Sequence, residues 1–180
     1  MASRSKLKDQ LRMAWEKTLT VDYPRKLIHS ERGLQHFFCK HLAEIFTEAG
    51  VARTHRLFIE PCLAADDGKL RSPDLLICHT QRIIGVVEFK FRPKSKASTT
   101  KDLGTLAWLA SHPAGLKLSN KRYLGTGDDV VQAYALAEDA LLCWAGVYHR
   151  SDIGQLNKDR RFHAMHAVTS PGAAPLLSFE

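Results

Sequence analysis

Two neighbouring apolar segments carry charged residues whose types and spacing could hydrolyse a bond. Asp74 stands near the start of segment 73–79, and Glu88 and Lys90 lie in segment 82–91. Residues two apart on a strand point to the same face, so Glu88 and Lys90 would share a face. If the two segments form a hairpin, Asp74 lies across from the Glu88 end. Two carboxylates and one ammonium group would then converge on one patch.

The three groups suit phosphodiester cleavage. Carboxylate oxygens are hard ligands for Mg²⁺, and a bound metal lowers the pKa of its water and neutralises charge on a phosphate. The ammonium group of Lys90 could position or deprotonate the attacking water, or stabilise the anionic transition state. In the alternative interpretation, Glu88 and Lys90 pair on an exposed strand and Asp74 only closes a turn. Their apolar neighbours favour burial, and buried charges are usually paired, metal-bound or functional.

A helix is expected over residues 30–49, just before these segments. Ser30 suits an N-cap, and Gly50 suits the position that ends a helix. Apolar residues recur with the i, i+3, i+4 spacing of one buried stripe. They are Leu34, Phe37, Phe38, Leu42, Ile45, Phe46 and Ala49.

Three strands are expected next, over residues 54–65, 73–79 and 82–91, with a turn at 66–69. The third segment is apolar on both faces, as in a central strand that is covered on both sides. The remaining predictions are a short helix at 103–110, an irregular segment at 113–126, a helix at 127–142 with an apolar side, and strands at 144–149 and 161–168. The order of helix, three strands, helix and strand predicts an α/β fold with an antiparallel meander and a crossover.

The residues Ser72-Pro73-Asp74, followed by Glu88-Phe89-Lys90, resemble the motif of the PD-(D/E)xK nuclease superfamily. This superfamily includes restriction endonucleases and Holliday junction resolvases. The resemblance covers about residues 31–149 and implies an αβββαβ restriction-endonuclease-like core, with a mixed sheet flanked by helices. It also implies a Mg²⁺-dependent nuclease, with Mn²⁺ as a substitute, that acts on DNA as an endonuclease. Two alternatives stay open: a non-catalytic nucleic-acid-binding module on the same fold, and a nuclease directed at RNA.

The resemblance adds two candidates to the catalytic set. Glu31, early in the first helix, would join Asp74 and Glu88 in binding metal or water. It lies on the apolar stripe and is expected to face inward, but it could instead only favour the helix N-terminal dipole. Gln132 is the polar candidate on the helix at 127–142, or else a solvated helix residue. Glu60 could approach the same site or face solvent.

The charge balance favours a polyanionic partner. Lys and Arg total 26 against 19 Asp and Glu, which gives a net charge of +7. Nucleic acid, DNA before RNA, is the partner expected first, and a homodimer or a partner protein is an added option. Basic residues after the motif are candidates for a rim that contacts phosphates, with solvated loop lysines as the alternative. The rim candidates are Arg92, Lys94, Lys96, Lys101, Lys117, Lys121 and Arg122.

Length and composition set the frame for these predictions. The chain has 180 residues, 44% of them hydrophobic and 25% charged, which is typical of one folded domain. We expect an N-terminal arm at 1–29, a nuclease-like core at 30–150 with a basic insertion at about 92–126, and a C-terminal strand and tail at 151–180. No apolar run approaches a membrane span, and the polar N-terminus lacks the apolar core of a signal peptide. The prediction is a cytoplasmic protein that does not bind membranes.

Cysteine and histidine residues give weaker signals. The four cysteines, Cys39, Cys62, Cys78 and Cys143, form no Cys-x-x-Cys pair, so buried free thiols are expected. His163 and His166 are close in sequence but would face opposite sides of a strand. We therefore expect ordinary surface histidines rather than a metal pair.

Overall fold

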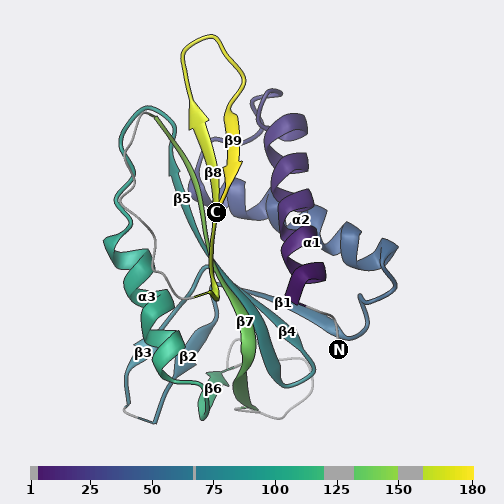
Figure 1. Ribbon diagram of the computed structural model, residues 1–180, viewed down its shortest axis with the longest axis vertical. Coiled ribbons are helices and arrows are strands. Elements are labelled where there is room, and N and C mark those ends of the chain that lie inside the picture. The colour runs from purple at the N-terminus through teal and green to yellow at the C-terminus, as the bar shows by residue number, and fades with distance from the viewer. Residues whose placement is uncertain (1–3, 67, 120–131, 150–159) are drawn as a thin grey trace.

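The protein has a mixed α/β architecture, an open sheet flanked by helices (Figure 1). The computed structural model describes residues 4–66, 68–119, 132–149 and 160–180. The helical elements are α1 (Arg4–Lys17), the π-helical η1 (Thr18–Asp22), α2 (Glu31–Glu48) and α3 (Thr100–Ser111). The strands are β1 (His55–Ile59), β2 (Cys62–Ala64), β3 (Leu70–Arg71), β4 (Leu75–His79), β5 (Arg82–Arg92), β6 (Leu116–Ser119), β7 (Gln132–His149), β8 (Phe162–Thr169) and β9 (Leu176–Phe179).

The predicted helix at 30–49 is confirmed as α2. The Ser30 side chain caps it by accepting the Gly33 N–H at 3.1 Å. Gly50 follows the C-terminus with φ +70°, a conformation that glycine adopts without strain. The predicted stripe is buried at Leu34, Phe38 and other positions, so amphipathic periodicity places this helix against the sheet.

Three antiparallel strands and two parallel ones make up most of the main sheet. β1 pairs with β4 and β4 with β5, both antiparallel, and the predicted hairpin is confirmed by the pairs His79↔Arg82 and Leu75↔Val87. β5, β7 and β8 are parallel neighbours, and β9 pairs antiparallel with β8. The segment predicted as one strand at 54–65 divides into two. β1 joins the main sheet, whereas β2 pairs with β3 and β6.

The helices cover opposite faces of the sheet (Figure 1). α1 and α2 pack on one face, and α3 packs on the other. The N-terminal residues expected as an arm contribute to the core, since Leu11 and Trp15 of α1 are fully buried. Gly85 of β5 allows this packing, because a Cβ there would lie 3.2 Å from the Leu7 side chain.

The helix expected at 127–142 is wrong where the structure describes it. Residues 132–149 form the long strand β7, and 127–131 lie outside the described residues. Alanine and leucine favour helix locally, but pairing with β5 and β8 and burial on both faces override that preference. The predicted short helix at 103–110 is confirmed as α3, and it forms the crossover between β5 and β7. The segment expected to be irregular contains β6, and the strand expected at 161–168 is β8.

Several smaller predictions also have outcomes. All four cysteines are free thiols, and Cys39, Cys78 and Cys143 are buried. The prediction of surface histidines is wrong, because His163 and His166 are buried on β8. Within the described part of the chain, no helix combines the length and apolarity needed to span a membrane.

Candidate active site at the N-terminal ends of α2 and α3

Strand β5 extends past the end of β4, and this overhang positions two carboxylates. The last β4 pair is Leu75↔Val87, so the next β5 amides on that edge face no strand. Asp74 Oδ2 accepts the Phe89 N–H at 2.6 Å, and Glu31 Oε2 accepts the Phe91 N–H at 3.0 Å. The two side chains therefore satisfy backbone donors that a longer β4 would have paired.

The backbone of Asp74 is itself held from two sides. Its carbonyl accepts a hydrogen bond from Gln35 Nε2 at 2.6 Å and one from the Glu60 N–H at 2.9 Å. Gln35 is buried one turn after Glu31 on α2. Glu60 has φ +46°, which is uncommon outside glycine and is often found near functional sites. α2 and the β1–β2 connection together fix the position of Asp74.

Glu88 is a buried acid beside Asp74. Glu88 is only 6% exposed, and its Oε1 has no hydrogen-bond partner among the described residues. Burial is the main cause that raises the pKa of Glu88 to about 9, and the negative charges of Asp74 and Asp102 add to it. Burial also raises the pKa of Asp74, although its bond from the Phe89 amide opposes that shift.

Lys90 is paired across the site rather than with Glu88. Its Nζ lies 3.2 Å from Asp102 Oδ2 and 3.9 Å from Glu31 Oε2. Asp102 is buried in the first turn of α3, and its Oδ2 also accepts the Trp144 indole N–H at 3.3 Å. Asp102 was missing from the predicted site. A signal was present, because Asp102 shares a helical line with buried Leu106, at the spacing of an apolar stripe.

Acidic groups outnumber basic ones here, which favours binding of a cation. The acids are Glu31, Asp74, Glu88 and Asp102, and the cations are Lys90, which pairs with Glu31 and Asp102, and Lys101, which lies near Glu88. Like charges that share a poorly hydrated site repel one another. Across the described residues, no group of three or more His, Cys, Asp or Glu side chains is arranged to hold a metal. Mg²⁺ commonly uses one or two protein carboxylates and fills its other positions with water and phosphate. The unpartnered oxygen of Glu88, next to Asp74, fits that requirement.

A pocket is lined by two of these acids, Glu31 and Asp74, and two helix N-termini contribute to it, whereas Glu88 and Asp102 lie behind its lining. Its lining includes Ser30, Glu31 and Arg32 from the start of α2, Lys101 from the start of α3, and Asp74 between them. Helix N-termini carry partial positive charge and favour anions. Glu60, which sequence could not place, also lines this pocket, with Oε1 3.6 Å from Arg32 Nε.

The predicted inward position of Glu31 is wrong, although the residue does reach the site. Its side chain is 45% exposed and extends over the edge of β5 towards Lys90. The buried stripe of α2 begins only at Leu34, while Glu31 in the first turn bonds the Phe91 N–H of β5.

Gln132 lies on a strand rather than on the predicted helix, and it lies away from the acids. Gln132 begins β7 and pairs with Leu118 of β6. Further along β7, Ala135 pairs with Arg82 at the start of β5, whereas Lys90 pairs with Gly146. Gln132 therefore lies beyond the end of β5 that is distant from the acids.

The predicted basic rim divides into four groups. Arg92, Lys94 and Lys96 are exposed on the segment that leaves β5, and Lys101 lines the pocket. Lys117 lies on β6 and pairs with Asp66 at 3.4 Å. Lys121 and Arg122 lie outside the described residues.

The first of these groups is anchored to the sheet. The Thr169 hydroxyl donates to the Pro93 carbonyl at 2.7 Å, and the His149 N–H donates to the Ser95 carbonyl at 3.1 Å. The basic segment is therefore tied to the ends of β7 and β8, beside the end of β5 that carries the acids.

Comparison of the chain with protein-family models, curated proteins and solved structures finds no match. Functional assignment therefore depends on the chemistry of these residues.

Proposed function

We propose that the protein is a metal-dependent nuclease that hydrolyses phosphodiester bonds in DNA as an endonuclease. The observation that carries this proposal is the acid pair of half-buried Asp74, which lines a pocket, and buried Glu88, which shares a strand face with Lys90. Burying two carboxylates is costly without a compensating charge, so their position requires a reason beyond folding. A metal-binding hydrolytic site gives that reason.

The element order supports a restriction-endonuclease-like core. α2 is followed by the antiparallel strands β1, β4 and β5, then by α3, and then by β7 parallel to β5. This is the αβββαβ order that the resemblance implies, with β2, β3 and β6 as additions. Asp74 comes directly before the second strand of that order, and Glu88 and Lys90 lie late in the third.

Each residue of the site has a role in this proposal. Mg²⁺, or Mn²⁺ in its place, would be held by Asp74 and Glu88, with Glu31 as a further candidate ligand. The bound metal would supply a water of lowered pKa and neutralise charge on the phosphate. Lys90, held by Asp102, orients the attacking water or stabilises charge on the phosphate oxygens. Gln132 is given no role, because of its place on β7.

The substrate is proposed from charge and anchoring. Arg92, Lys94 and Lys96 stand on a segment tied to the sheet, and Lys101 lines the pocket itself. Such side chains would contact backbone phosphates, which DNA and RNA share. We retain DNA as the first substrate, RNA as the alternative, and the cytoplasm as the location. Cutting two strands would need a second copy or a partner protein.

The deciding experiment is cleavage of matched DNA and RNA in Mg²⁺, Mn²⁺ and EDTA. We expect the wild type to cleave supercoiled plasmid with either metal, and not in EDTA. Glu88→Gln and Asp74→Asn should remove cleavage while circular dichroism shows intact folding. Glu48→Gln is a matched control, because Glu48 is exposed at the far end of α2. Inactive but folded wild-type protein, or full cleavage by folded Glu88→Gln, would refute the proposal.

A further inference from the structure

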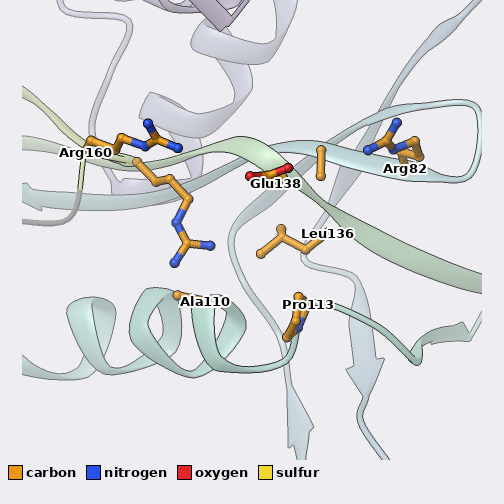
Figure 2. Close-up of a pocket in the computed structure, with 8 residues that line it drawn as sticks. Arg82, Ala110, Pro113, Leu136, Glu138 and Arg160 are labelled. Carbon is orange, nitrogen blue, oxygen red and sulfur yellow. The ribbon is translucent and has the colours of Figure 1, made fainter.

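A second pocket lies beside the C-terminal end of α3, at the other end of that helix from Lys101 and Asp102 (Figure 2). Arg82 at the start of β5 and Arg160 and Arg161 before β8 contribute to its lining. Residues far apart in the sequence therefore bring guanidinium groups to one hollow.

The charge of this pocket is mainly positive. Three arginines line it against one acid, Glu138. In the part of the chain that the structure describes, the side chains of Arg82 and Arg160 form no hydrogen bond or ion pair. By contrast, Arg12 lies 3.2 Å from Glu16. A guanidinium group presents planar donors that match a phosphate, so unpaired ones at a pocket suit an anionic ligand.

The floor of the pocket is apolar. Ala110 and Pro113 lie below the arginines, and Leu136 of β7 lies between the two sides in Figure 2. An apolar wall lowers the local dielectric constant and strengthens the attraction between a guanidinium group and an anion. An arginine at this pocket should therefore attract an anion more strongly than a fully exposed surface arginine would.

The exposed face of α3 connects this pocket to the acidic site. Lys101 is followed on that face by Gly104, Ala107 and Ser111, all exposed and small. A Cβ added at Gly104 would meet no atom within 4 Å, so the surface there is open. From Lys101 to Ser111 the helix rises about 15 Å at 1.5 Å per residue. That rise matches roughly four to five base steps of a duplex at 3.4 Å each.

We propose that Arg82 and Arg160, which lie on either side of Glu138 in Figure 2, each contact a backbone phosphate of the nucleic acid whose cleaved bond lies at Asp74 and Glu88. The strand would run along the exposed face of α3, between the two sites. This inference rests on the proposed function, because the acid pair marks the other end of the path. It assigns the arginines a phosphodiester ligand and gives the substrate a minimum length.

Binding of a labelled 20-base-pair duplex, measured by fluorescence anisotropy in EDTA over a range of salt, tests the arginines. The double variant Arg82→Ala with Arg160→Ala should bind more weakly. Its slope of log affinity against log salt should be smaller by about 0.9 for each lost contact. Lys40→Ala is the control, because it removes a charge from α2 on the opposite face of the sheet. Wild-type affinity and slope in the double variant would overturn the proposal.

A second pair of variants tests the path along α3. Ala107→Glu places a negative charge on the exposed face, midway between the sites, and should weaken binding of the same duplex. Ala43→Glu makes the same change on the exposed side of α2 and should not. Equal binding by the two variants would also overturn the proposal. Both tests are run in EDTA, so they measure binding whether or not the protein cleaves DNA, and a missing nuclease activity is detected separately.

Discussion

Asp74 and Glu88 occupy one site but are held differently. Asp74 is fixed by its bond from the Phe89 amide and by the bonds that Gln35 and the Glu60 amide give its carbonyl. Glu88 has an unpartnered oxygen and a pKa raised to about 9, mainly by burial. The site therefore contains one acid in a fixed position and one whose ionisation is unfavourable. Positive charge brought near Glu88 would favour its ionised form.

The raised pKa of Glu88 predicts a specific pH dependence of stability. An unfolded glutamate ionises with its ordinary pKa of 4.5, whereas the pKa of folded Glu88 is about 9, so Glu88 keeps its proton to about that pH. Between these values the unfolded chain binds fewer protons, so its free energy falls relative to the folded state as pH rises. The free energy of unfolding is therefore highest below pH 4.5, and between the two pKa values it falls by up to about 1.4 kcal/mol per pH unit.

Urea unfolding in EDTA between pH 7 and 8.5 measures this effect. We expect the free energy of unfolding of the wild type to fall with pH and that of Glu88→Gln to fall less steeply. Burial lowers the pKa of His163 and His166 from 6.5, so their protonation changes below this range. Equal slopes in the two proteins would contradict the expectation.

The variant Asp74→Asn distinguishes charge repulsion between Asp74 and Glu88 from the structural support that Asp74 gives through its hydrogen bond from Phe89. An asparagine oxygen can still accept the Phe89 N–H, while the negative charge next to Glu88 is removed. In EDTA near pH 9, where wild-type Glu88 begins to ionise beside Asp74, the variant should therefore melt at or above the wild-type temperature in differential scanning calorimetry. Mg²⁺ should raise the melting temperature of the wild type, because binding only to the folded state adds about 2.7 kcal/mol to the free energy of unfolding at a hundredfold excess over Kd. The melting temperature of the variant should hardly change.

The control for this experiment is Asp74→Ala, which loses the bond to Phe89 together with the charge and should melt lower than Asp74→Asn. If Asp74→Asn melts well below a wild type that does not respond to Mg²⁺, then Asp74 has only a structural role.

At the level of elements, the offset between neighbouring strands makes the site. β4 stops where β5 continues, so Asp74 and Glu31 occupy the edge that a longer strand would have covered. On the other side of β5, strand β7 brings Trp144 beside Glu88, and its indole holds Asp102 of α3. Lys90 is thus placed by a helix on one face and a strand beside it.

Gly146 of β7 is expected to be essential for this arrangement. A Cβ there would lie 2.1 Å from the Trp144 ring, so Gly146→Ala must displace the indole that bonds Asp102. Overpacking of this kind costs about 1–3 kcal/mol. Urea unfolding followed by tryptophan fluorescence should show the loss of stability, along with an altered folded-state spectrum.

Gly104→Ala is the matched control, because its Cβ would meet open space on an exposed helix face. Alanine there should stabilise the protein by about 0.5–1 kcal/mol. A Gly146→Ala protein as stable as the wild type would show that the Trp144 ring moves without cost.

Sequence reasoning worked where local signals and tertiary contacts agree. The stripe of α2 and the apolar segments of β4 and β5 were read correctly, and with them the meeting of Asp74 and Glu88. It failed for β7, whose composition favours a helix while strands on both sides impose an extended form. The helical line that Asp102 shares with Leu106 indicated a buried position, but its partner Trp144 is 42 positions away, and one sequence does not reveal that contact.

On the scale of the whole molecule, charges are arranged around an acidic centre. The exposed basic residues Arg92, Lys94 and Lys96 leave β5 just after Lys90, on a segment tied to β7 and β8. The pocket lining is acidic on balance, with Glu31, Glu60 and Asp74 against Arg32 and Lys101, and the basic segment lies beside it. Phosphates on either side of a cleaved bond would meet the positive groups, while the cleaved group itself would meet the acids and their cation.

Replacing Lys94 and Lys96 with alanine should weaken DNA binding equally for all sequences. Phosphate contacts carry no base information, so the loss should appear as a smaller salt slope, by about 0.9 per lost contact. Anisotropy titrations with two duplexes of unrelated sequence measure this. Lys117→Ala is the control, because Lys117 pairs with Asp66 on the β2–β6 side. An unchanged slope in the double variant would mean that both lysines are only solvated.

The parallel pairing of β5 with β7 also determines the order in which the protein can be assembled. The β4–β5 hairpin needs only local contacts, whereas Glu88 and Trp144 are separated by 56 positions, from 88 to 144, before they pair. Closing a loop of that length is slow compared with forming a hairpin. Until β7 arrives, the apolar strand β5 has one unprotected edge, and such edges promote aggregation. On the ribosome, the acid pair would therefore come together early, while Lys90 would wait for Trp144 to fix its partner.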